Sequence, residues 1–189
     1  MKESIHQLKV TLVGSRPPVW RRIQVASSVL LGELHHTLQS AMGWENYHLH
    51  VFEVNGVQYG EPHPDDWHPV RNEARITLKG VAPRAGDGFM YTYDFGDNWE
   101  HRVLVEKILP AEPGKTCPLC LAGKRACPPE DCGGVWGYQE LLVALADPQH
   151  PDHDQYREWV PEDFDPESFD PTVATMLMQP ARAAGAVRR

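Results

Sequence analysis

The sequence lacks any apolar run long enough to cross a membrane, and its first residues, MKESIHQ, lack the apolar stretch of a signal peptide. It also lacks a phosphate-binding loop, a dinucleotide fingerprint and a recognisable nucleophile motif. These absences argue against a membrane protein and give no sign of a nucleotide-dependent or covalent catalyst. We therefore expect a cytoplasmic protein without a membrane partner.

Basic residues are in short supply. The chain has 18 Lys and Arg residues against 26 Asp and Glu residues, which gives a net charge of −8. Such a surface repels the phosphate backbone, so binding of nucleic acid is disfavoured. Arg16, Arg21 and Arg22 form a local basic cluster that keeps a DNA-associated regulator as the third functional hypothesis.

The apolar pattern predicts an α+β fold with a mainly antiparallel sheet and one N-terminal helix packed on it. Ser27 or Ser28 caps that helix, which carries an apolar stripe and ends near Gly43. Asn55-Gly56 is a strong hairpin signal. Period-2 alternation, β-branched residues and aromatic residues predict strands near 8–12, 19–25, 47–54, 57–59, 73–79, 88–95 and 101–109.

A helical segment follows the Cys/Pro/Gly-rich loop. Helices are expected at 137–146, at 152–159 and from Pro171, where Asp170 is the cap. We expect a single domain over residues 1–180, with 132–180 as its helical part, and a disordered tail at 181–189. Arg157 is the only Lys or Arg between residues 140 and 170, where acidic residues dominate. This acidic stretch predicts either a solvated face or a docking surface for a protein partner.

All cysteines of the chain fall within sixteen residues, as Cys117, Cys120, Cys127 and Cys132. Four thiols on one loop suit a tetrahedral Zn²⁺, so we predict a structural zinc at these residues. Two alternatives stay open. The thiols either form two disulfides, or are small buried groups in a rigid loop whose Glu130 and Asp131 cap the following helix.

A second informative stretch is YTYDFGDNWEH, residues 91–101. Gly96-Asp97-Asn98 is expected to form a turn that brings Asp94 and Asp97 close to His101. These groups suit a metal or acid–base catalysis, or else the aspartates cap backbone N–H groups. The aromatic residues of the stretch are expected in the core. Weaker histidine candidates are His35, His36, His48, His50, His150 and His153.

These stretches, with CLAGKRACPPEDCGG, DPQHPDH and LHHTLQSAMGWENYHLHVF, resemble the plasmid pRiA4b ORF-3-like family, also labelled insertion-sequence passenger proteins of TnpR type. The resemblance covers residues 5–172 and implies an α+β domain associated with mobile genetic elements, without a defined activity. Its pattern includes Cys120, Cys127 and Cys132, whereas Cys117 and residues 61–72 depart from it. A resolvase, which the passenger name suggests, finds no support because Ser15 lies in a turn.

Two functional hypotheses lead. The first is a non-catalytic protein-interaction module that uses the zinc-stiffened loop and the acidic helical face. The second is a metal-dependent hydrolase of phosphoester type, which requires the two motifs to meet in space. Its candidate residues are Asp94, Asp97, His101, Glu130 and Asp131.

Overall fold

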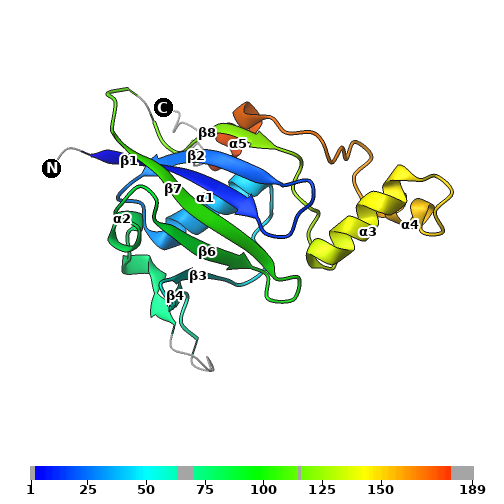
Figure 1. Ribbon diagram of the computed structural model, residues 1–189, viewed down its shortest axis with the longest axis horizontal. Coiled ribbons are helices and arrows are strands. Elements are labelled where there is room, and N and C mark those ends of the chain that lie inside the picture. The colour runs from blue at the N-terminus through cyan, green and yellow to red at the C-terminus, as the bar shows by residue number, and fades with distance from the viewer. Residues whose placement is uncertain (1–2, 64–69, 115, 180–189) are drawn as a thin grey trace, which may run out of the picture.

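The computed structural model describes residues 3–63, 70–114 and 116–179. It is an α+β fold built on one eight-stranded sheet in the order β5-β4-β3-β6-β7-β1-β2-β8 (Figure 1). The strands are β1 (Ser4–Leu12), β2 (Trp20–Ala26), β3 (His50–Val54), β4 (Val57–Gly60), β5 (Arg71–Asn72), β6 (Gly88–Tyr93), β7 (Trp99–Pro110) and β8 (Leu119–Lys124). The helices are α1 (Leu31–Met42), α2 (Leu78–Val81), α3 (Gly134–Ala146), α4 (His153–Trp159) and α5 (Pro171–Met178).

Antiparallel pairing dominates the sheet, as predicted, and only β4 and β5 run parallel among the described strands. β1 lies between β2 and β7, so the N-terminal strand is central. Its alternation explains the placement, because Leu8 and Val10 are buried whereas Lys9 is partly exposed. The hairpin at Asn55-Gly56 is also confirmed, with positive φ at both residues.

The core lies between the sheet and α1, whose Leu31, Leu34 and Leu38 are fully buried. Gly43 ends the helix in a left-handed conformation, as predicted. The predicted serine cap is wrong. Ser27 is buried and hydrogen-bonds the hydroxyl of Ser4 and the ring of His6, so it ties β1 to β2.

Two segments differ from the sequence-based prediction. Residues 73–79 form a 3-10 turn, η1 (Glu73–Arg75), and the start of α2 rather than a strand. The Asn72 side chain accepts a hydrogen bond from Ala74 N, and this local bond competes with strand pairing. Within the predicted Cys loop, β8 forms because β2 offers it an edge for pairing.

The C-terminal helices lie in the segments where helices were predicted, and Asp170 caps α5 through Thr172 N. Figure 1 shows α3 and α4 side by side at one end of the molecule, whereas α5 lies by β8. Within the described residues, no helix is long and apolar enough to span a membrane. The predicted tail at 181–189 lies outside the described residues, and the single-domain boundaries stay a prediction.

Candidate metal centre

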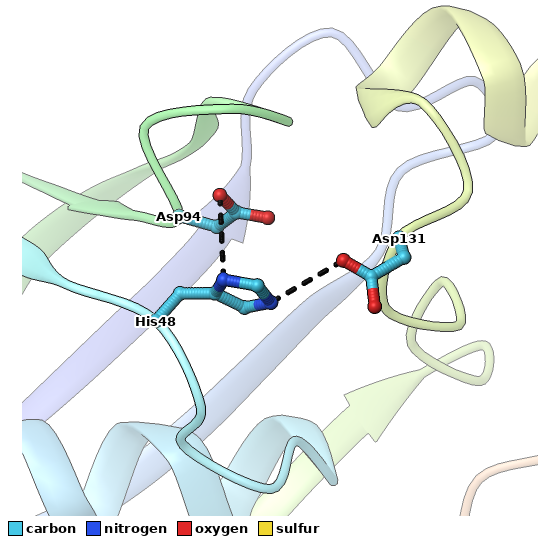
Figure 2. Close-up of side chains that lie close together, drawn as sticks. All are labelled: His48, Asp94 and Asp131. Carbon is cyan, nitrogen blue, oxygen red and sulfur yellow. Dashed lines mark ion pairs between the residues drawn. The ribbon is translucent and has the colours of Figure 1, made fainter.

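Three loops bring His48, Asp94 and Asp131 together (Figure 2). The His48 ring lies between the two carboxylates, with Nδ1 3.8 Å from Asp94 Oδ1 and Nε2 3.3 Å from Asp131 Oδ1. One ligand atom from each residue lies within 4.8 Å of the others. Across residues 3–63, 70–114 and 116–179, this is the one group of three or more His, Cys, Asp or Glu residues with such spacing. The arrangement is suited to a divalent cation.

The backbone around Asp94 fixes its carboxylate. Asp94 has a φ of +55°, a conformation that aspartate tolerates better than most residues. Its amide donates to Leu49 O at 2.9 Å, which joins the end of β6 to the loop that carries His48. Its Oδ1 accepts from Gly96 N at 2.9 Å, so the predicted turn cap is present. Asp94 therefore both closes the turn and faces His48.

The turn after β6 is also anchored to the loop before α3. Asp97 Oδ2 accepts a hydrogen bond from Gly133 N at 3.1 Å. A Cβ atom at Gly134 would lie 2.4 Å from Asp97 O, so a side chain there would collide with backbone. The two sequence motifs thus meet in space, which the hydrolase hypothesis required.

Tyr93 and Glu130 hold the loop that carries His48. The Tyr93 hydroxyl donates to Glu130 Oε1 at 2.6 Å and accepts from Tyr47 N at 2.9 Å. Burial, and then the bond to Glu130, raises the pKa of Tyr93, so the phenol keeps its proton. Glu130 Oε2 accepts from Glu45 N at 3.3 Å. Glu130 therefore positions the loop of His48 instead of facing the candidate cation.

His101 does not join this group. It shares one face of β7 with Trp99, as predicted, but that face is the core, and its side chain is fully buried. Its Nδ1 lies 3.3 Å from Tyr91 O, and Nε2 has no hydrogen-bond partner. Burial lowers the pKa of His101 to about 4. In the hydrolase hypothesis, His48 thus replaces His101 as the imidazole.

A pocket of about 1120 Å³ opens beside His48 and runs along β3. His50 and Val51 both line it, and because neighbouring strand residues face opposite sides, it reaches both faces of the sheet. Leu49 and Phe95 supply exposed apolar side chains on its wall. Phe95 is 56% exposed, which contradicts its predicted place in the core, whereas Tyr91, Tyr93 and Trp99 are buried as predicted.

A histidine stack forms another part of the pocket wall. The rings of His35 and His50 are parallel with centroids 3.5 Å apart, and His50 Nε2 lies 3.0 Å from Glu73 Oε2. His35 Nε2 bonds Asn46 Oδ1, which only accepts, so His35 carries its proton there and its Nδ1 accepts from the Tyr91 hydroxyl. Burial lowers the pKa of His35 to about 3, so this ring is neutral.

The comparison with protein families identifies the family of this chain. A family model described as plasmid pRiA4b ORF-3-like protein matches residues 4–173. This chain belongs to the plasmid pRiA4b ORF-3-like family. The resemblance inferred from the motifs is thereby confirmed.

Two similar proteins extend the comparison. The uncharacterized protein y4hQ of Sinorhizobium fredii (strain NBRC 101917 / NGR234) is 44% identical over 161 residues, or 84% of this chain and 82% of the relative. The crystal structure of MM3350, a protein of unknown function from Methanosarcina mazei Go1, matches with a TM-score of 0.84 and 41% identity, over 91% of this chain and 98% of that chain. The fold is therefore shared with MM3350.

The cysteines in the pRiA4b ORF-3-like loop are all free thiols, so the structure does not pair them as disulfides. Cys120 lies on β8, and Cys117 precedes that strand. Burial raises the pKa of the Cys132 thiol to about 12, and it also raises that of Cys127. Among the described residues, no three of these cysteines have sulfur atoms that all lie within 4.8 Å of one another, as the ligand atoms of the His48 group do. The structural zinc stays a prediction.

The remaining candidates have local roles. Arg21 is buried and donates to Ala41 O, and Arg22 forms an ion pair with Glu106, so neither contributes to an exposed basic patch. His153 bonds Ala144 O and joins α4 to α3. Sequence reasoning noted His48 only as a weaker candidate because it placed this residue on a strand over 47–54, whereas β3 begins at His50 and leaves His48 in the preceding loop.

Proposed function

We propose that this chain binds a divalent cation through His48, Asp94 and Asp131 and hydrolyses a phosphoester held in the adjoining pocket. The observation that carries the proposal is the convergence of one imidazole and two carboxylates from three separate loops, beside a pocket that His48 lines. The Asp94 side chain is only 10% exposed, whereas that of Asp131 is 74% exposed. The site is thus anchored on one side and open on the other.

The donor set defines the cation class. Imidazole nitrogen together with carboxylate oxygen suits Mn²⁺ or Zn²⁺ better than Ca²⁺, which prefers oxygen ligands alone. Three protein ligands leave coordination positions for water, and a bound cation lowers the pKa of such a water toward neutrality. In the absence of a cation, the two carboxylates lie on either side of the His48 ring and orient it.

Hydrolysis of bis(p-nitrophenyl) phosphate with added Mn²⁺ or Zn²⁺ tests the proposal. The wild-type protein should release p-nitrophenol in a cation-dependent manner, and Asp94→Asn should reduce the rate to background. Asp163→Asn removes the same charge from an exposed position and should keep the wild-type rate. Cation-dependent hydrolysis that survives in Asp94→Asn would refute the assignment of these residues.

A structural zinc at Cys117, Cys120, Cys127 and Cys132 is a separate proposal, supported by the soft donors gathered in one loop. Metal analysis of purified variants separates the two sites. Cys127→Ser should lose zinc and stability if the thiols bind it, since structural zinc contributes directly to folding. Loss of zinc in Asp94→Asn, with Cys127→Ser unchanged, would assign the metal to the His48 site instead.

A further inference from the structure

The outer face of α3 carries side chains that no part of the described structure covers. Trp136 is 84% exposed and Val143 is 60% exposed. Glu140 and Asp147 are exposed as well. The spacing of four and three residues places Trp136, Glu140 and Val143 on one side of the helix, and Asp147 follows as the residue that ends it. The result is a stripe in which apolar and acidic groups alternate.

The surroundings of this stripe are acidic. Arg157, the only Lys or Arg in residues 140–170, donates to the backbone oxygen of Glu162, so it neutralises no carboxylate of the stripe. Trp159 on the adjacent α4 is also substantially exposed. The exposed acidic residues on α3 and α4 or next to their ends are Glu140, Asp147, Asp152, Asp154 and Glu158.

The exposed indole of Trp136 and the carboxylates near it favour a partner with Lys or Arg side chains. Tryptophan is the best aromatic partner of Lys and Arg side chains and is enriched where one residue dominates an interface. Neighbouring carboxylates attract the same cations and repel acidic partners. Charge complementarity therefore favours a basic segment with apolar residues over a nucleic acid, an anionic membrane or another acidic surface.

We propose that the stripe Trp136, Glu140, Val143 and Asp147 binds a basic, partly apolar segment of a protein partner. The stripe begins near Gly133, whose amide bonds Asp97, so the start of α3 lies beside the turn that follows β6. The proposal does not depend on catalysis, and binding is measured with a chelator present. Its failure and the failure of the hydrolase proposal are therefore distinguishable.

The probe is a fluorescent amphipathic peptide with Lys and Leu at helical spacing, titrated with the full chain at physiological salt. Trp136→Ala should weaken binding about tenfold or more. Glu140→Gln should weaken it about threefold, whereas Glu3→Gln, which removes the same charge from an exposed position outside residues 140–170, should leave it unchanged. Leu177→Ala on α5, another exposed apolar position, should also bind as the wild type does.

Three results would overturn the proposal. The first is equal affinity of the wild type and Trp136→Ala for the Lys/Leu peptide. The second is equal binding of a control peptide with Glu in place of Lys. The third is self-association in sedimentation equilibrium that Trp136→Ala abolishes, which would assign the stripe to a second copy of this chain. Trp136 is exposed, so its replacement should leave the fold intact, and circular dichroism checks this.

Discussion

Asp94 shows how one residue can serve both the turn and the site. Its backbone N–H bonds Leu49, its backbone oxygen accepts from Asn98 at 2.6 Å, and its carboxylate faces Gly96 N and His48. Each contact restrains a different degree of freedom, so the carboxylate is held in place before any ligand binds. Such preorganisation favours binding, because little conformational entropy is lost on capture of a cation.

A prediction at this scale concerns Tyr93→Phe. The change leaves Glu130 Oε1 and Tyr47 N without their partner in a part-buried place, which should lower the free energy of unfolding by about 1–3 kcal/mol. Urea unfolding measures it. Tyr47→Phe is the control because its hydroxyl bonds Glu45 at an exposed place, and it should stay within about 0.5 kcal/mol of the wild type. Equal losses would show that the Tyr93 hydroxyl does not hold the loop.

At the scale of elements, the site depends on α3 docking against the turn between β6 and β7. Gly134 makes that contact possible, since its α-carbon approaches Asp97 O more closely than any side chain permits. The Cys/Pro/Gly-rich loop therefore sets the position of Asp131 through its glycines, whether or not its thiols bind zinc.

Gly134→Ala tests this contact, and Gly86→Ala is the control variant. Both positions have positive φ, so both variants incur backbone strain of about 1–2 kcal/mol. Only Gly134→Ala also collides with Asp97, because nothing lies within 4 Å of a Cβ at Gly86. We expect Gly134→Ala to unfold at lower urea concentration and to bind Mn²⁺ more weakly in calorimetric titration. Equal stability and cation affinity of the two variants would contradict the proposed contact.

At the scale of the whole molecule, the sheet divides the protein into a core face, packed on α1, and an outer face that carries charges. On the outer face, Arg22 contacts both carboxylate oxygens of Glu106, and Gln7 donates to the same group. The hydrogen bonds from Arg22 lower the pKa of Glu106 to about 2. β1, β2 and β7 are thereby joined by side chains as well as by the ladder.

This pair predicts a pH dependence of stability. A lowered carboxyl pKa in the folded state contributes stability above the unfolded pKa, and that contribution is lost as pH falls from about 5 to about 2. Allowing for solvent screening of the part-exposed pair, we expect Glu106→Gln to cost about 1–2 kcal/mol near pH 6. The difference from the wild type should shrink toward pH 2 in urea unfolding. A difference that stays constant with pH would refute the pair's contribution.

The fold was largely predictable because alternation and turn residues are local signals. β1 and the Asn55-Gly56 hairpin follow from them, whereas β8 needs the edge of β2, which no local pattern reveals. Alternation placed Trp99 and His101 on one face, and the burial predicted for Trp99 holds for His101 as well, which removes His101 from the candidate site.

The same limit applies to the site. Asp94, Asp97, Glu130 and Asp131 were identified as chemically informative, but only the tertiary structure separates the two that face His48 from the two that anchor loops. His48 itself lies in a loop that is held by the hydrogen bond from Tyr47 N to the Tyr93 hydroxyl, and Tyr93 is far away in sequence.

The most direct test of the central claim is the position of the anomalous-difference peak in crystals grown with Mn²⁺. We predict a peak between His48, Asp94 and Asp131, with both carboxylates and one imidazole nitrogen as ligands. The absence of a peak at this position in crystals grown with excess Mn²⁺ would contradict the account. A peak found only among the cysteine sulfurs would contradict it as well.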